Sequence, residues 1–250
     1  MESGWNHFEA REYDPVIGRW TAVDPARQFN SPYNGMGNNP IRSVDPDGRK
    51  IRWNIFKKQD KAAAANTIND LEEITGLILF ENADGDLGYI ENFEGYDPGT
   101  SATARSDLMA AIDNKTTLSV VSGKQSAGAE YTVMLSSNQI AKLVNGASGN
   151  LDNRTLGFGM TFLHEMHHTK FGINKLHPPT EKNQFGVTTD VVNRMNSIRG
   201  ELGTSWGQRT SYRGIQFSSG GKAYLPFDNN SKASMIKGYA PNKKTQFIAY

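Results

Sequence analysis

The pattern of apolar and polar positions changes near residue 50. Residues 1–48 hold five of the ten prolines and show no helical period, so we expect turns and short strands there. From Arg49 onward the pattern is that of an ordinary globular chain. Residues 61–76 are rich in alanine and end in Gly76, which predicts a helix that the glycine closes.

Two short segments further along the chain have the composition of strands. Residues 116–123 (TTLSVVSG) and 130–137 (EYTVMLSS) combine β-branched and apolar residues. The segment GKQSAGA at 123–129 joins them and consists of small and polar residues that favour a turn. We therefore predict a β-hairpin over these segments.

Two amphipathic segments predict helices in the second half of the chain. The first covers residues 156–172 and closes at Gly172, and the second covers residues 188–203 and closes at Gly203. The first has an apolar face made of Leu156, Phe158, Met160 and Leu163. Its Gly157 and Gly159 would let it pack closely against a neighbour. The second has an apolar stripe made of Val191, Val192, Met195, Ile198 and Leu202.

Charge and composition give no indication of nucleic-acid binding, membrane insertion or a signal peptide. The 250 residues include 27 basic and 26 acidic side chains, and the net charge of +1 gives no indication of binding to nucleic acid or anionic membrane. The longest apolar runs, such as TGLILF, are far shorter than the ~20 residues of a membrane span. The segment MESGWNHFEARE lacks the pattern of a signal peptide. With no cysteine, the strong metal ligands that remain are histidine, aspartate and glutamate.

Three of the five histidines fall within the stretch FLHEMHHTKFG. His164, Glu165 and His168 fit the pattern H-E-x-x-H, in which histidines at i and i+4 share one helix face and both reach one ion. Glu165 lies about 100° round the helix from His164, so it can contact a water on that ion without being a third ligand. This arrangement predicts a Zn²⁺ site with a built-in base. His167 is offset and is expected to be a core or surface histidine.

A catalytic zinc needs a third protein ligand and an open position for water. The candidates are His177 and Glu181 in a predicted loop, and Asp190 and Glu201 on the next predicted helix. Asp190 and Glu201 would lie about 16 Å apart along that helix, so they cannot share one ion. We favour Asp190, because its position 22 residues after His168 resembles the ligand spacing on the second helix of zincins.

The N-terminal segment contains the sequence motifs REYDPVIGRW, VDP and GNNPIRSVDPDG. Because of these motifs, residues 8–48 closely resemble the C-terminal end of the RHS-repeat core, the shell of bacterial polymorphic toxins. In that family the DPxG element marks the junction between the shell and a variable toxin. The resemblance implies two domains, with an RHS-core tail over 1–48 and a toxin domain over 49–250.

Asp24 and Asp45 in this segment match acidic residues that resemble a self-cleaving pair in RHS shells. The element at Asp45 is complete (DPDG), whereas the element at Asp24 reads DPAR and lacks the glycine. Both are also ordinary turn-forming Asp-Pro pairs. The rest of the shell is absent, so we expect no self-cleavage.

A second resemblance lies downstream of the histidines. The segment IRGELGTSWGQRTSYR is similar to the ELG and RTSY element that follows HExxH in the NleD-like effector peptidases, a family of injected zinc proteases. The resemblance implies that Tyr212 or Arg209 donates a hydrogen bond to the oxyanion at the scissile carbonyl. A tyrosine that caps the core with its hydroxyl outward is the alternative for Tyr212.

Together these patterns predict an α+β, zincin-like metallopeptidase domain after a short RHS-core tail. We expect zinc-activated water to hydrolyse peptide bonds of a target-cell protein, with Glu165 as general base. The RHS resemblance implies a cognate immunity protein and the remaining RHS shell or a secretion apparatus as partners. It also implies synthesis in a bacterial cytoplasm, without a signal peptide, before delivery to a target cell. The alternatives are a zinc-dependent amidase for a non-protein substrate and a non-catalytic zinc-binding module.

Overall fold

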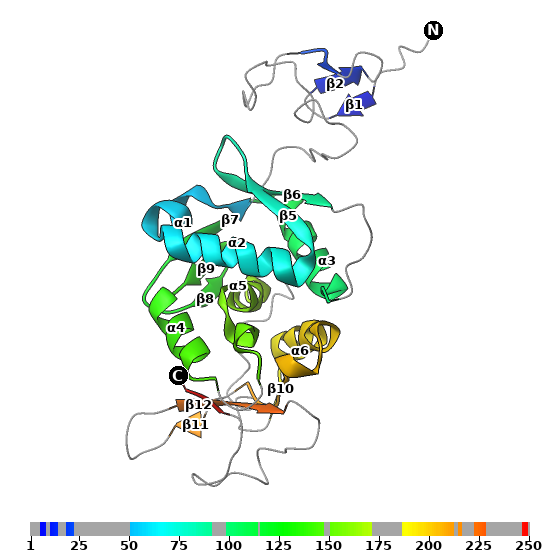
Figure 1. Cartoon of the computed structure of the whole chain (residues 1–250). Coiled ribbons are helices and arrows are strands. Elements are labelled where there is room, and N and C mark those ends of the chain that lie inside the picture. The colour runs from blue at the N-terminus through cyan, green and yellow to red at the C-terminus, as the bar shows by residue number, and fades with distance from the viewer. Residues whose placement is uncertain are drawn as a thin grey trace.

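The computed structural model describes residues 6–8, 11–14, 19–22, 51–91, 99–114, 116–147, 151–171, 187–212, 215–216, 223–228 and 247–249. Its centre is a six-stranded mixed sheet with the strand order β5-β6-β4-β7-β9-β8 (Figure 1). The strands are β4 (Ile51–Arg52), β5 (Leu77–Glu81), β6 (Asp86–Glu91), β7 (Leu118–Ser122), β8 (Ala127–Ala129) and β9 (Thr132–Leu135). Because β8 is at the end of this order, it is an edge strand.

Six α-helices accompany this sheet in the described part of the chain. They are α1 (Asn54–Gln59), α2 (Lys61–Thr75), α3 (Ala102–Ile112), α4 (Ser137–Asn145), α5 (Phe158–His167) and α6 (Asp190–Leu202). In Figure 1, α2 crosses in front of α5, and α6 lies beyond them toward the C-terminal strands. The chain therefore has the α+β architecture that its sequence predicts.

The core lies between one face of the sheet and the helices. Along β5, Leu77 and Leu79 are buried, whereas Ile78 and Phe80 are exposed, because successive side chains of a strand point to opposite faces. The buried residues of the strands join those of α2, α3, α5 and α6 in one apolar cluster. This cluster is the support on which α5 is held.

Two predicted helices are confirmed together with their ends. In α2, Asp60 accepts a hydrogen bond from the Ala63 N–H at 3.0 Å, and Gly76 closes the helix at φ 68°. In α6, the Thr189 hydroxyl accepts from Val192 at the first turn, and Gly203 follows the last helical residue at φ 116°. The positive φ values explain why glycine stands at both C-caps.

The predicted hairpin over residues 116–137 is wrong. The two strands that it was to join, β7 and β9, pair in parallel, with Ser119 opposite Thr132. The supposed turn segment instead contributes β8, which pairs antiparallel with β9, and the real turn is at Glu130 and Tyr131. Parallel and antiparallel neighbours show the same alternation of side chains, and the sequence AGA of β8 carries no apolar signal.

The helix predicted over residues 156–172 is shorter than expected. A 3₁₀ turn, Asn153–Leu156, precedes α5, and α5 ends at His167 with His168 as its C-cap. The chain then leaves the helix, because the Lys170 N–H donates to the Glu130 carbonyl in the turn between β8 and β9 at 2.8 Å. Because α5 already ends at His167, the prediction that Gly172 closes the helix was wrong; Gly172 itself lies outside the described residues.

Two smaller sheets complete the described structure. Near the N-terminus, β1 (Asn6–Phe8), β2 (Arg11–Asp14) and β3 (Arg19–Trp20) form an antiparallel meander. Near the C-terminus, β10 (Gln208–Arg209), β11 (Ile215–Gln216), β12 (Ala223–Asp228) and β13 (Phe247–Ala249) form the other sheet. Strands β12 and β13 lie within residues 218–250, a segment in which the sequence pattern predicts no helix or strand. In the residues described, no helix is long and apolar enough to cross a bilayer.

Candidate metal centre

The N-terminal end of α5 is fixed against α2 by a glycine and an aspartate. A Cβ on Gly159 would come within 2.7 Å of the Asp70 Cβ, so the helix approaches this closely only without a side chain there. Asp70 accepts a hydrogen bond from the Gly159 N–H at 3.0 Å, where a carboxylate also complements the helix dipole. Desolvation raises the pKa of Asp70. The predicted close packing at this glycine is confirmed.

His164 lies on α5 and His168 one turn later at its C-cap, and their rings are in edge-to-face contact. Their Nε2 atoms are 3.3 Å apart, and the ring planes meet at 78°. His168 is buried, at 4% exposure. Two nitrogen ligands of a tetrahedral zinc, each at about 2.0–2.1 Å, would be separated by about 3.3 Å. The pair therefore fits the coordination of one zinc ion.

The surroundings keep His164 neutral. Desolvation, followed by the positive charge of Arg209, holds the pKa of His164 well below its usual 6.5. A neutral imidazole has a free lone pair, which is the state that binds a metal ion. The site is therefore poised to take a cation at neutral pH without first losing a proton from this ring.

Glu165 occupies the position between the histidines in sequence and is directed toward the edge strand β8. Burial raises the pKa of Glu165 from 4.5 to about 7, although a hydrogen bond from the Gly128 backbone N–H partly opposes this rise. Gly128 has to be glycine here, because a Cβ would lie 1.7 Å from the Glu165 carbonyl oxygen. Strand β8 thus supplies both close packing and a hydrogen bond to the predicted base.

Tyr212 is brought to the histidine pair from 44 residues downstream. Its hydroxyl lies 3.5 Å from Nε2 of His168, and its ring stacks over that of His164 at a centroid distance of 6.3 Å. Arg209 holds this tyrosine, because its guanidinium donates to the backbone carbonyls of Ser211 and Tyr212. The hydroxyl of Tyr212 therefore lies beside the histidine pair. It does not point outward, which was the alternative that the sequence left open.

The two candidates for the third ligand on α6, Asp190 and Glu201, are not grouped with the histidines. Asp190 is exposed at the first position of α6. Glu201, at the other end of α6, accepts hydrogen bonds from the hydroxyls of Ser101 and Thr103 and so caps α3. Burial would raise the pKa of Glu201, but these hydrogen bonds outweigh it and lower the pKa.

The other two candidates, His177 and Glu181, lie outside the described residues, as do Asp24 and Asp45. Across the ranges that the structure describes, no three histidine, aspartate or glutamate side chains are grouped closely enough to hold an ion. The assignment of Asp190 as third ligand stays a prediction.

His167 is a core histidine, which is one of the two positions, core or surface, that the sequence left open. Its Nε2 lies 3.1 Å from a carboxylate oxygen of Asp107, which also receives two hydrogen bonds from Arg194. Burial raises the pKa of Asp107, but the hydrogen bonds from His167 and Arg194 outweigh that effect and lower it. The three side chains tie α3, α5 and α6 together, which fixes the helix that carries the metal-binding pair.

Arg199 lies near the site and was not predicted. It is 2% exposed, and its positive charge contributes to the lowered pKa of His164. Its sequence signal is a break in the apolar stripe of α6, since it stands seven residues, or two helical turns, after the buried Val192. A charged residue on an apolar helix face is the feature that would have identified it.

Comparisons with known proteins give one short similarity. No family model and no solved structure matches the chain. The chain is similar to Salivary gland surface protein 1 of Aedes aegypti, at 48% identity over 48 residues. The similarity covers 19% of this chain and 1% of that protein, so the chain spans only a hundredth of its relative's length. It is too short to define a family for the whole chain.

Proposed function

We propose that this protein is a zinc-dependent endopeptidase with a zincin-like catalytic domain over residues 49–250. The observation that carries the proposal is the pair of imidazole Nε2 atoms, 3.3 Å apart, with a half-buried glutamate at the position after the first histidine. His164 and His168 would hold the ion. When bound there, zinc would polarise a carbonyl and acidify its water.

The residues around the pair suit the hydrolysis of an amide. With a pKa of about 7, Glu165 accepts a proton from water at neutral pH and returns it to the departing amine. The hydroxyl of Tyr212, 3.5 Å from the His168 ring nitrogen, is placed to donate a hydrogen bond to the carbonyl oxygen as negative charge develops on it. Each role uses a group that already lies at the site.

The edge strand β8 favours a peptide as substrate. In the described residues β8 pairs with β9 on one side only, and α5 packs against it beside Glu165. An extended peptide adds to such an edge through main-chain hydrogen bonds. The backbone of a protein substrate would then run past the predicted base.

The resemblance of residues 8–48 to the end of RHS cores supports a role as a delivered toxin. We infer that the catalytic domain is the C-terminal toxin of an RHS polymorphic toxin, delivered by the shell or a secretion apparatus into a target cell. Its substrate is then a target-cell protein, and a cognate immunity protein protects the producing cell.

A substrate panel tests the reaction. The full chain loaded with zinc is incubated with unfolded protein, with peptidoglycan fragments and with simple N-acyl amides, beside the Glu165→Gln variant. Cleavage of the protein alone, lost in the variant at unchanged zinc content, supports the peptidase. Cleavage of only the other amides indicates the amidase, and stoichiometric zinc without any hydrolysis indicates a binding module.

A further inference from the structure

A cavity opens beside His164 and Glu165, on the side of α5 toward α6 and the C-terminal sheet. Apolar side chains form much of its wall, and they are Leu143, Leu156, Met160 and Leu225. The rest of the lining is polar and includes two guanidinium groups, those of Arg199 and Arg209, together with Ser126, Gln139, Thr155 and Thr161. Of these two, Arg199 is the buried charge that needs an explanation, because an ionised group is costly to bury without a partner of opposite charge.

The contacts of Arg199 leave part of its hydrogen-bonding capacity unused. Its Nε donates to the Thr155 hydroxyl at 2.7 Å, and its terminal nitrogens donate to the Thr155 carbonyl and to the Asn196 side chain, both at 3.2 Å. A guanidinium has five N–H groups. Within the described residues these three account for its acceptors, so two N–H groups remain for a ligand.

The acceptors of Arg199 are also all neutral. In the part of the chain that the structure describes, no carboxylate lies within ion-pair distance of this guanidinium, and the charge that perturbs it is the repulsive Arg209. Desolvation and that repulsion lower the pKa of Arg199 to about 9. By contrast, the exposed Arg154 forms ion pairs with Asp152 and Glu73.

We propose that this cavity binds a carboxylate of the substrate, the side chain of an aspartate or glutamate close to the scissile bond, with Arg199 as its partner. The inference rests on the proposed peptidase function and names a substrate class for it. Guanidinium and carboxylate match in planar geometry and form two parallel hydrogen bonds. The apolar wall contacts the methylene groups of the acidic side chain, and the carboxylate supplies the negative charge that Arg199 lacks.

Cleavage specificity tests the inference. The zinc-loaded full chain digests a peptide mixture from a denatured bacterial proteome, and the cleaved bonds are identified by mass spectrometry. Synthetic peptides built on the best site then compare Glu, Gln and Lys at the selected position. We expect at least a tenfold higher kcat/KM for Glu than for Gln, a magnitude typical of hydrogen bonds to a charged group, and still less cleavage with Lys.

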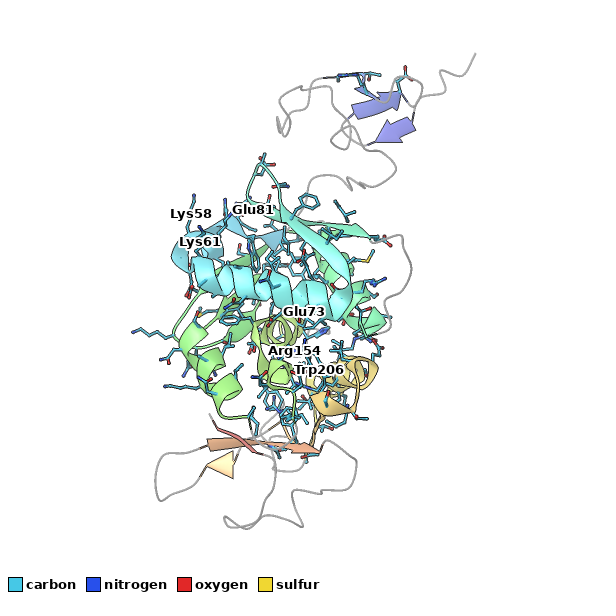
Figure 2. All side chains as sticks on the ribbon, viewed as in Figure 1. Lys58, Lys61, Glu73, Glu81, Arg154 and Trp206 are labelled. Carbon is cyan, nitrogen blue, oxygen red and sulfur yellow. The ribbon has the colours of Figure 1, made fainter. Side chains whose placement is uncertain are left out.

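Variants assign the preference to the cavity. Arg199→Gln should bring the Glu to Gln ratio close to one, and Arg199→Lys should keep part of it. The ratio cancels any general loss of catalysis. Arg154→Gln removes an arginine that does not line the cavity and that lies between Glu73 and Trp206 (Figure 2), so it should leave the ratio unchanged.

The outcomes separate the two proposals. If the wild-type chain cleaves peptides without an acidic preference, the cavity inference is overturned and the peptidase stands. If it cleaves none of them, the peptidase function fails and the cavity inference fails with it. If Arg199→Gln does not fold, as judged by circular dichroism, the wild-type preference and the Arg199→Lys variant still decide.

Discussion

Glu165, the proposed general base, should destabilise the metal-free fold at alkaline pH. Burial raises the pKa of Glu165 from 4.5 to about 7, so between these pH values the folded chain holds a proton that the unfolded chain has lost. Stability contributed by this group therefore falls as pH rises from about 4.5 to 7, and it stays low above 7. Replacing Glu165 by glutamine removes that cost.

The magnitude follows from the two pKa values. The interval from 4.5 to about 7, at about 1.4 kcal/mol for each pH unit, corresponds to about 3 kcal/mol at pH 8. At pH 5 the same calculation leaves less than about 1 kcal/mol. Glutamine keeps an oxygen that accepts from the Gly128 N–H, so Glu165→Gln should not leave this backbone donor unsatisfied. For a domain of this size, 3 kcal/mol is a rise in Tm of about 6–12 °C.

Thermal unfolding with and without zinc checks this prediction. In the presence of a chelator, Glu165→Gln should unfold at a clearly higher temperature than the wild type at pH 8 and at nearly the same temperature at pH 5. Zinc should reduce the difference at pH 8, because a bound cation favours the ionised carboxylate. Glu130→Gln, a change at the surface glutamate paired with Lys170, is the matched control and should shift neither curve much.

An equal Tm for Glu165→Gln and wild type at pH 8 without metal would refute the claim that desolvation raises the pKa of Glu165. A lower Tm for the variant at both pH values would indicate instead that the ionised carboxylate has an important partner in the fold.

Three further predictions concern the site and its support. Gly128→Ala should destabilise the fold by at least about 2 kcal/mol in urea unfolding, because its Cβ meets the Glu165 carbonyl oxygen at 1.7 Å; an unchanged midpoint would contradict the close approach of β8. Tyr212→Phe should lower kcat about 100-fold at unchanged zinc content if its hydroxyl stabilises the oxyanion, and equal kcat would remove it from that role. Asp190→Ala should weaken zinc binding at least ~10-fold whereas Glu201→Ala should leave it intact, and the reverse pattern in a zinc titration would exclude Asp190 as ligand.

The parts of the fold that depend on local sequence could be predicted. The spacing of His164 and His168 on a helix decides that both imidazoles share a face, whatever packs around them. Gly76 and Gly203 mark helix ends because they adopt a backbone conformation that other residues avoid. These features need only residues a few positions apart.

The parts that depend on long-range pairing could not. The sequence has no local signal for the parallel pairing of β7 with β9, because alternation along each strand is the same in either direction. It has none for the approach of β8 to α5 either, apart from the presence of Gly128. Tyr212 entered the prediction through a resemblance, and its position beside His168 depends on how the C-terminal strands follow α6.

Arg199, which was not predicted, interrupts the apolar face of α6 with a buried charge. The apolar stripe of α6 predicted a helix and a buried face, and an arginine two turns after Val192 contradicts that pattern at one position. Arg199 ties α6 to the 3₁₀ turn through Thr155 and lies over the Phe227 ring, but burying a guanidinium whose described acceptors are all neutral still costs more than burying an apolar side chain of similar size. The proposed substrate carboxylate would offset that cost, so a break in an otherwise regular apolar face is a position to test for a residue whose partner arrives on binding.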